Sequence, residues 1–414
     1  MDKTKTTPPL PLKGLRIVAI EQYGAAPFGT MFLADLGAEV IKIENHHVGG
    51  EMGRHVVPYG HGSDSLFYQA FSGNKRSLAL DLKSKKGRVA FERLIATSDA
   101  LINNLRGDLP DKLGLDYATL SAIKPELVCV HLSAYGRGGS RDSWPGLDYV
   151  MQAEAGYLSM TGEPDSPPTR FGLSVVDFMA GLTAAVALLS GIIGARQSGR
   201  GQDYDAALFD VAMSNLSYPA VWHLTEGYTP ERVARSGHPS LVPSELYETS
   251  DGWIFIMANK AHFWPRLVGA MDHPEWADDP RMDSFKTRLE NRDLVVDLLA
   301  KAFLTRTTED WMGRLSGLLP CAPVRDVAEA LASDFAAERK IIQSVDHPHW
   351  REMKNVRQPI LVDGQVMPRR RAPDLGEDTR ALLDELGYDL ADIDEMEREG
   401  VVASPGPEKS DTPE

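Results

Sequence analysis

The stretch from Pro167 to Gly194, PPTRFGLSVVDFMAGLTAAVALLSGIIG, constrains the fold of this chain more than any other. After Asp177 it has the composition of a helix interior, because Ala and Leu are strong helix formers and no proline interrupts them. Apolar residues surround the helix axis on all sides, and a helix of that kind is buried in a core. The chain is therefore expected to fold around this helix.

One carboxylate, Asp177, stands in the first turn of the predicted helix. Backbone N–H groups lack partners there and the helix dipole is positive, so the ionised form of Asp177 is expected to be favoured and oriented. A structural alternative is that Ser174 or Asp177 simply caps the helix. The rest of the chain has to decide between these two interpretations.

Charge and apolar patterning exclude two classes of partner. The 414 residues carry a formal net charge of −15, and no Lys/Arg block is long enough to follow a phosphate backbone, which argues against nucleic acid. The longest apolar run, Phe178 to Ala195, has about the length of a membrane span, but it is rich in Gly and Ala and follows Asp177 directly. We interpret it as a core helix and expect no membrane partner.

Two features favour a cytoplasmic protein. The chain has only two cysteines, Cys129 and Cys321, and both lie in apolar, strand-like surroundings that suit buried thiols better than a disulfide. The N-terminal MDKTKTTPPLPLKG has neither the apolar segment of a signal peptide nor the Arg-rich pattern of an organelle presequence.

The first third of the chain alternates between short β-branched runs and helical segments. Such alternation predicts βαβ units, a parallel sheet and hence an open α/β fold of Rossmann type. The expected strands are Gly14–Ile20, Ala38–Ile43, Ser77–Leu82, Ala100–Asn103 and Leu127–Leu132, and the expected helices are Pro27–Leu36, Ser84–Thr97 and Tyr117–Lys124. A strand at Gly201–Ala206 and a helix at Ala207–Thr225 follow the central helix.

The pattern of alternating strand and helix segments changes near Gly237, and this change predicts a second, smaller α+β domain. Its expected strands are Glu245–Thr249 and Trp253–Ala258, and its expected helices are His262–Met271, Arg288–Leu304 and Thr308–Ser316. After it come a helix at Val324–Ala332, a strand at Gln358–Val362 and a closing helix at Asp378–Leu386. The predicted domains are residues 12–225, 226–330 and 331–402, the last returning to the large domain, with disordered tails at 1–11 and 403–414.

The sequence motifs of several common enzyme classes are absent or weak in this chain. GxGxxG is absent after the first strand, where the sequence is EQYGAAP, and neither a phosphate-binding GxxxxGK[ST] nor a nucleophilic GxSxG occurs. Gly136-Arg137-Gly138-Gly139 is either a phosphate cradle or an ordinary turn. The histidine pairs His46-His47 and His347-Pro348-His349 lack ligand spacing for zinc, and Arg369 to Arg371 form either a phosphate clamp or a solvated face.

Five segments, taken together, resemble the class III coenzyme A transferases, a family that includes formyl-CoA transferase, carnitine CoA-transferase and α-methylacyl-CoA racemase. The resemblance extends from about Leu12 to Val402, in order and at family spacing. The segments are Pro27 with LADLGAEVIKIE (Leu33–Glu44), NKRS (Asn74–Ser77) with LDLK (Leu80–Lys83), MTGEPDSPPTRFGLSVVDFMAG (Met160–Gly181), QSGRGQ (Gln197–Gln202), and RAPDLGEDT (Arg371–Thr379) followed by LGY.

The resemblance implies a Rossmann-like large domain built from both chain ends, a smaller domain between them, and two subunits threaded through each other as an obligate homodimer. It also implies that Asp177 is the family's nucleophilic aspartate, so the functional interpretation of Asp177 is preferred. A desolvated carboxylate attacks an acyl thioester, giving a mixed anhydride and CoA thiolate, and the thiolate then forms an enzyme thioester. Coenzyme A and acyl-CoA are substrates in this scheme, with succinyl-CoA as the expected donor, and no permanent cofactor or metal is required.

The resemblance also suggests a set of CoA contacts. The family has a phosphate-binding basic residue just after the second strand, but this chain has Asn45 there, so Lys42, Arg76 or Arg106 are the alternatives for that contact. The suggested contacts are Gly24, Ala25, Asn45, Leu80, Leu82, Asn104, Leu105 and Lys112. Gly237 and His238 match a mobile loop that covers the site in relatives, or else form an ordinary turn.

One departure from the family separates two branches. Racemases carry a catalytic His in a Gly-His-Asp segment, whereas this chain has Gly146-Leu147-Asp148, and Leu147 cannot transfer a proton. Transfer of CoA to a free carboxylic acid is therefore favoured over racemisation or epimerisation, and a non-catalytic acyl-CoA-binding protein is the third possibility. Trp144, Leu147, Tyr149 and Phe171 indicate a partly apolar substrate pocket, although large aromatic residues more often belong to the core.

Overall fold

The computed structural model describes residues 10–405 and divides the chain into two compact units. Of the described residues, unit 1 contains 10–155, 173–215 and 337–405, and unit 2 contains 156–172 and 216–336. Compared with the predicted bounds, unit 2 also takes the segment 156–172 that precedes the central helix. The predicted disordered tails lie mostly outside the described residues; Leu10 packs against Gly37, and Ala403 pairs with a strand.

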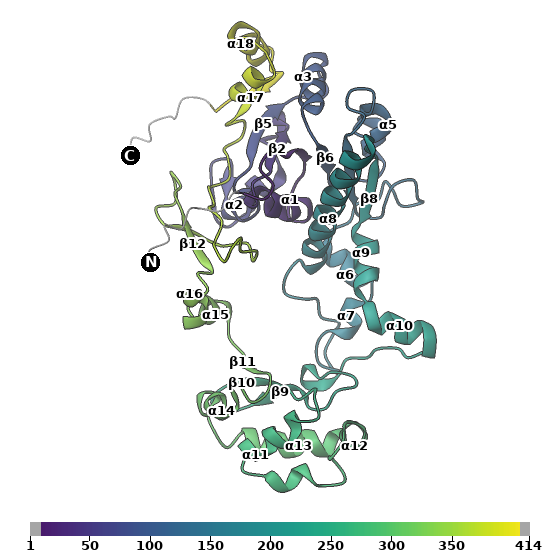
Figure 1. The fold of residues 1–414 in the computed structure, drawn as a ribbon, viewed down its shortest axis with the longest axis vertical. Helices are drawn as coiled ribbons and strands as arrows, with labels where there is room; N and C mark the ends of the chain where they lie inside the picture. The colour runs from purple at the N-terminus through teal and green to yellow at the C-terminus, as the bar shows by residue number, and fades with distance from the viewer. Residues whose placement is uncertain (1–9, 406–414) are drawn as a thin grey trace. The chain divides into compact units, whose positions relative to one another are not determined.

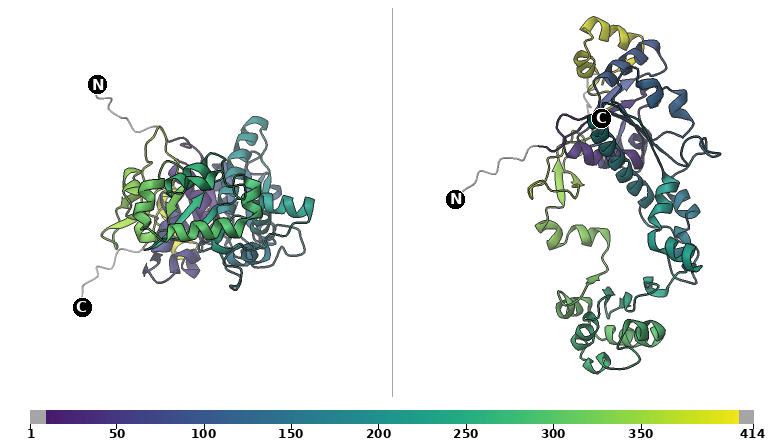
Figure 2. Two further views of the ribbon diagram at one scale, coloured as in Figure 1. Left: turned by 90° about the horizontal axis from the view of Figure 1, so that it is seen from below. Right: turned by 45° about the vertical axis from the view of Figure 1, so that its right-hand side comes forward.

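A seven-stranded sheet forms the centre of unit 1 and confirms the predicted α/β fold with a parallel sheet. All its neighbouring strands run parallel except the C-terminal strand β14, which pairs antiparallel with β5, so the two ends of the chain meet in one sheet (Figures 1 and 2). The strand order is β14 (Val402–Ala403), β5 (Arg76–Leu80), β2 (Glu39–Glu44), β1 (Arg16–Ile20), β6 (Ala100–Asn103), β7 (Val128–Ser133) and β8 (Asp203–Ala207).

Helices cover both faces of this sheet, because strands of a parallel sheet point side chains to each side in turn. Val18, Leu101 and Cys129 point toward one face, where they share a buried cluster with α3 (Lys85–Ala96), α17 (Thr379–Glu385) and α18 (Leu390–Arg398). The opposite face packs against α8 (Val175–Ser198), which touches Val128 at Gly191. The remaining helices of unit 1 are α1 (Ala25–Asp35), α2 (Leu66–Ser72), α4 (Leu109–Lys112), α5 (Tyr117–Leu120), α6 (Asp148–Glu154) and α9 (Leu208–Asn215).

Helices α1 and α8 approach each other closely through two glycines. A Cβ on Gly29 would lie 2.1 Å from the carbonyl oxygen of Gly181, and a Cβ on Gly181 would lie 2.3 Å from that of Ala25. Backbone contacts this short exclude any side chain at either position. This packing holds the start of α1 against the second turn of α8.

The central helix is present as predicted but is not buried on every side. Its sequence would allow α8 to cross a membrane by length and composition, yet it packs against α1, β7 and α9 inside unit 1. Leu182, Val186 and Ile193 are 41%, 64% and 58% exposed. The prediction of a completely buried helix is therefore wrong for the single chain, which leaves an apolar face of α8 uncovered.

Unit 2 contains a three-stranded antiparallel sheet covered by helices, as predicted for an α+β region. Its sheet order is β11 (Cys321–Pro323), β10 (Trp253–Met257) and β9 (Ser244–Glu248). Trp264, Phe303 and Trp311 fill the core beside this sheet. The helices are α7 (Tyr157–Met160), α10 (Ser217–Glu226), α11 (Phe263–Ala270), α12 (Phe285–Glu290), α13 (Arg292–Phe303), α14 (Thr308–Leu315) and α15 (Val327–Leu331).

Two predicted elements differ from the structure. The helix expected over Ala207–Thr225 breaks at Ser217, which has a φ of 50° and separates α9 from α10. The strand expected at Gln358–Val362 does not form, because Pro359 has no N–H to donate and the Gln358 side chain bonds the backbone of Ile360 instead. The elements near it are helix α16 (Asp334–Glu338) and the hairpin β12 (Ile342–Val345) with β13 (Met353–Val356), and a second small hairpin joins β3 (Gly60–His61) to β4 (Asp64–Ser65).

Candidate active site

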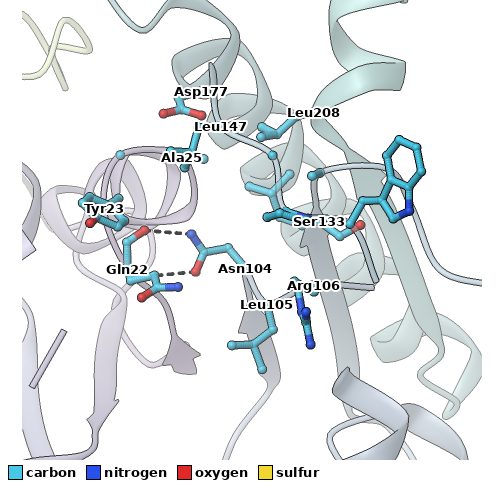
Figure 3. Close-up of a pocket in the computed structure, with 16 residues that line it drawn as sticks. Gln22, Tyr23, Ala25, Asn104, Leu105, Arg106, Ser133, Leu147, Asp177 and Leu208 are labelled. Atoms are coloured by element: carbon cyan, nitrogen blue, oxygen red, sulfur yellow. Dashed lines mark hydrogen bonds between the residues drawn. The ribbon is translucent and has the colours of Figure 1, made fainter. Parts of the chain in front are cut away.

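A cavity of about 280 Å³ opens at the carboxyl ends of strands β1, β6 and β7 in unit 1. The chain leaves β1 toward β2 and β5 on one side and returns to β6 on the other, so the cavity lies where the strand order reverses. Open α/β sheets bind their ligands at this kind of position. The cavity is lined by Gln22, Tyr23, Gly24, Ala25, Asn104, Leu105, Arg106, Leu132, Ser133, Ala134, Trp144, Pro145, Gly146, Leu147, Asp177 and Leu208 (Figure 3).

Asp177 lines this cavity from the first turn of α8, close to the turn that precedes α1. A Cβ on Gly24 would lie 3.1 Å from Oδ2 of Asp177, so the absence of a side chain at Gly24 leaves room for the carboxylate. The structure thus brings together three residues that the sequence had singled out: Gly24, Ala25 and Asp177. Leu147 lies beside them (Figure 3).

Asp148 of α6 caps helix α8, a role that the sequence had offered to Ser174 or Asp177. Its Oδ2 accepts hydrogen bonds from the backbone N–H groups of Val176 (2.6 Å) and Asp177 (3.0 Å). Within the described residues Ser174 makes no side-chain cap bond, and Asp177 makes none to its own helix. The capping interpretation of Asp177 is therefore wrong, and its carboxylate remains available for chemistry.

The expected stabilisation of ionised Asp177 by the helix is also wrong. Burial is the first cause, and the negative charge of Asp148 the second, that raise the pKa of Asp177 from its ordinary value of 3.8 to about 7. The physical reason is that Asp148 already occupies the N–H groups that would have stabilised the anion. Asp177 is consequently a carboxylate whose charged form is disfavoured, a property typical of reactive groups.

The turn after β1 forms the wall nearest Asp177 and is held by two polar side chains. Asn104 accepts from the N–H of Gln22 at 2.9 Å and donates to its carbonyl at 2.8 Å (Figure 3). Buried Glu51 accepts from the N–H of Tyr23 at 2.9 Å, where the backbone has a positive φ of 60°. Asn104 and Glu51 thus fix the turn that leads into the predicted CoA contacts Gly24 and Ala25.

The predicted CoA contacts separate into two groups. Gly24, Ala25, Asn104 and Leu105 line the cavity. The others lie outside it: Leu80 is in the core, Leu82 packs against that core, Asn45 accepts from the N–H of His47, and Lys112 is 65% exposed and paired with Asp108. Those four residues contribute no surface to this cavity.

The structure decides among the three basic alternatives for the phosphate contact. Lys42 is fully buried against Glu21 and Glu51, and Arg76 pairs with Glu39, Glu385 and Asp378. Arg106 lines the cavity and is partly exposed, and in Figure 3 it lies at the end opposite to Asp177. Of the three, only Arg106 can reach a ligand in the cavity.

The remaining loops flagged in the sequence are held by local bonds. The Gly136 N–H donates to Ser133, and the turn 136–139 does not line the cavity. His347 pairs with Asp64 in a buried contact, and no cluster of three possible metal ligands occurs within residues 10–405. Arg369 pairs with Asp35 and Arg371 with Glu377, which favours a structural role over a phosphate clamp.

Gly237 and His238 belong to unit 2 and form a well-bonded turn. The imidazole Nδ1 of His238 accepts from the N–H groups of Ser240 and Leu241, and Arg292 donates to the carbonyl of His238 at 2.7 Å. These contacts favour the ordinary-turn alternative for this segment. Phe171 also lies in unit 2, whereas Trp144 lines the cavity in unit 1.

Sequence reasoning missed several residues of the site. Gln22 and Tyr23 stood in a turn without a known motif, and Leu208 stood at the start of a predicted helix. In the sequence Asp148 stood out only as the neighbour of Leu147, because Ser174 and Asp177 were the local candidates for the cap. Its partner amides lie 28 and 29 residues away in sequence, so no local pattern links them.

Comparison with known proteins gives concordant matches. Residues 12–379 match the CoA-transferase family III. The chain is 30% identical to the succinate–glutarate CoA-transferase of Agrobacterium fabrum (91% of this chain, 96% of the relative) and 31% identical to the succinyl-CoA:mesaconate CoA-transferase of Haloarcula hispanica (91% and 96%). A crystal structure of a CAIB/BAIF family protein from Brucella suis matches with a TM-score of 0.79 at 29% identity, covering 92% of this chain and all of that one.

These matches extend over nearly the whole chain. Because the family match covers far more than half of the sequence, the chain belongs to CoA-transferase family III.

Proposed function

We propose that this CoA-transferase moves CoA from an acyl-CoA, with succinyl-CoA as the donor, to a free carboxylic acid through covalent intermediates on Asp177. The observation that carries the proposal is a half-buried carboxylate with a pKa raised to about 7, placed in the cavity at the strand ends. The names of the Agrobacterium and Haloarcula relatives support succinate or succinyl-CoA as one partner in the exchange. We propose a cytoplasmic location, which the two free cysteines favour.

The proposed sequence of steps is balanced without any added reagent. A carboxylate oxygen of Asp177 attacks the thioester carbon, the C–S bond breaks, and CoA leaves as the thiolate with a mixed anhydride formed. The thiolate then attacks Cγ of Asp177, which releases the donor acid and leaves an aspartyl–CoA thioester. The acceptor carboxylate attacks the aspartyl–CoA thioester, which releases CoA thiolate and forms a second mixed anhydride. The thiolate then attacks the acceptor's acyl carbon in that anhydride, so that a new acyl-CoA departs and Asp177 is regenerated.

The cavity supplies what these steps need. The N-terminal N–H groups of α1 begin at Gly24 and Ala25, beside Asp177, where they can donate to a developing oxyanion. Among the described lining residues, the titratable groups are Tyr23, Arg106 and Asp177. The second base of a racemase is missing at Leu147, whose hydrocarbon side chain lines the wall, and this favours CoA transfer over proton exchange.

One experiment tests the proposed function. The protein is incubated with succinyl-CoA and a panel of mono- and dicarboxylic acids in deuterated buffer, and acyl-CoA products are identified by mass spectrometry. The proposal expects new acyl-CoA species without deuterium at the α-carbon, and hydroxylamine trapping is expected to modify Asp177. Deuterium exchange without a change of acyl acceptor would support the racemase, and acyl-CoA binding without either reaction would support a non-catalytic protein.

Arg106→Ala is expected to raise the KM for acyl-CoA by about tenfold and to leave kcat nearly unchanged. A phosphate contact far from the reacting carbon contributes equally to substrate and transition state, and losing it affects binding alone. Initial rates over a range of succinyl-CoA concentrations measure this. Lys112→Ala is the matched comparison, since Lys112 lies outside the cavity; a larger KM effect at Lys112 than at Arg106 would contradict the assignment.

We further propose that two copies form the interlocked obligate homodimer implied by the family resemblance. The apolar face of α8 supports it, because Val186 and Ile193 are 64% and 58% exposed in the single chain. Light scattering after size exclusion is expected to give twice the chain mass at every concentration, and Val186→Glu is expected to lower the yield of that species. A wild-type monomer at micromolar concentration would contradict the proposal.

A further inference from the structure

The carboxylate of Asp148 is buried without a cationic partner. Asp148 is 3% exposed, its Oδ1 accepts from Nε2 of Gln152 at 2.6 Å, and its Oδ2 accepts from the N–H groups of Val176 and Asp177. No Lys, Arg or His forms an ion pair with it anywhere in residues 10–405. Three neutral N–H donors therefore hold a buried negative charge directly behind the cavity wall.

The two backbone donors are the ones that a helix normally offers to its own cap. They belong to the second and third residues of α8, and an N-cap side chain usually accepts from these positions. Ser174 stands at the N-cap but makes no such bond. Asp148 takes over this role from a different helix, α6, and the two helix starts are joined through one carboxylate.

We infer that Asp148 is a positioning residue for the transfer reaction, which keeps Asp177 turned into the cavity and disfavours its free anion relative to its acylated forms. This inference rests on the proposed function of Asp177 as the nucleophile. With these two amides of α8 already occupied, the Asp177 carboxylate does not cap its own helix and lines the cavity beside Gly24. The geometry of the cap thus determines where the reactive oxygen atoms lie.

The charge of Asp148 has a second consequence. Both the mixed anhydride and the aspartyl–CoA thioester make the Asp177 side chain neutral, whereas the free carboxylate is an anion. Repulsion by Asp148 raises the free energy of the anion and leaves the neutral intermediates almost unaffected. The acylated enzyme is therefore favoured, and the free carboxylate is a stronger nucleophile because it is more basic.

Other charged groups around Asp177 do not replace this effect. Tyr23 and Arg106 line the same cavity, α1 has no charged residue in its first turn, and Asp210 of α9 is exposed to solvent. Besides burial, Asp148 is the one charge that contributes to the raised pKa of Asp177. Removing that charge should act on Asp177 in a way that a merely structural substitution does not.

Asp148→Asn tests the inference because an amide oxygen can still cap α8 while the charge is lost. The pH midpoint of kcat/KM, near 7 in the wild type, is expected to move about one unit toward lower pH, and the amount of hydroxylamine-trapped enzyme is expected to fall about tenfold. Asp148→Ala removes the cap as well, and is expected to lower both the rate and the thermal midpoint. Asp210→Asn, which removes an exposed first-turn carboxylate of α9, is the matched control and should change none of these.

A titration that does not depend on turnover separates this inference from the proposed function. In protein labelled with ¹³C-aspartate, the signal absent from Asp177→Asn identifies Asp177, and its pKa is followed by NMR in wild type and Asp148→Asn. A lowered pKa in Asp148→Asn supports the inference even if no acid accepts CoA. An unchanged pKa and an unchanged pH profile would overturn it, even if CoA transfer is confirmed.

Discussion

Replacing Asp177 by asparagine is expected to lower the rate of CoA transfer by at least about 10⁴-fold, the order of loss found when a covalent enzyme loses its nucleophile. An amide of the same shape cannot attack a thioester to form an anhydride, so no acylated enzyme should be trapped. The measurement is formation of new acyl-CoA from succinyl-CoA and a free acid, with hydroxylamine trapping alongside. Asp210→Asn, in the first turn of α9, is the control carboxylate and should retain full activity.

Stability measurements on the same variant separate lost chemistry from lost structure. The folded protein holds the Asp177 proton up to a pKa of about 7, whereas the unfolded chain releases it near 3.8. The contribution of Asp177 to folding stability therefore falls as pH rises from about 4 to 7, because its ionisation is disfavoured in the folded state. Asp177→Asn is thus expected to equal the wild type at pH 4 and to melt at a higher temperature at pH 8. An inactive variant that melts at a lower temperature at pH 8 would point to misfolding instead.

The second large effect is expected at Glu21, in a buried charge network behind the cavity. Its Oε1 lies 2.6 Å from Nζ of Lys75 and 3.5 Å from Nζ of Lys42, and all three side chains are fully buried. Glu21→Gln leaves two buried ammonium groups, of which Lys42 keeps its ion pair with Glu51 and Lys75 loses its ion pair with Glu21. Breaking a buried pair from one side costs about 3–5 kcal/mol of unfolding free energy, because the charge that remains is uncompensated.

Chemical denaturation measures this loss of unfolding free energy. The pH dependence of the loss shows whether an uncompensated lysine charge causes it. Burial lowers the pKa of Lys75 from 10.5 to about 8 even with Glu21 present, and without Glu21 the pKa falls further. Because the folded variant releases the Lys75 proton at a lower pH than the folded wild type, the deficit of Glu21→Gln is expected to shrink as pH rises toward about 8 and to stay constant above it, where Lys75 is neutral in both folded proteins. Lys86→Ala, which removes a surface ion pair, should leave the midpoint almost unchanged. A loss below about 1 kcal/mol at Glu21 would show that the network is not balanced as described.

The Glu21 network also explains how the cavity wall keeps its shape. Lys42 bonds Glu51 at 2.8 Å, and Glu51 in turn holds the backbone of Tyr23 in its positive-φ conformation. A non-glycine residue in that conformation is strained and persists only where its surroundings hold it in place. The charges buried behind β1 thus fix the turn that faces Asp177.

The sequence by itself determined the features that depend on local composition and periodicity. Alternating β-branched runs and helical segments predicted the parallel sheet, and the apolar run after Asp177 predicted the central helix. The order of short motifs indicated the family and singled out Asp177, because motifs of this kind are recognised along the chain without knowledge of contacts. The predicted residues Gly24, Ala25, Asn104 and Leu105 follow strands of that sheet, and the cavity does lie at the ends of those strands.

Only the tertiary structure decided how Asp177 is held and charged. The cap of its helix comes from Asp148, 29 residues earlier. The raised pKa of Asp177 arises from burial and from that same Asp148 side chain. Local rules assign a first-turn aspartate to its own helix end and to the ionised state, and they fail here because the helix amides are already occupied. Likewise, the exposed face of α8 and the choice of Arg106 over Lys42 and Arg76 depend on which side chains the fold buries. Long-range contacts set burial and electrostatics, and neither property is present in the spacing of residues along the chain.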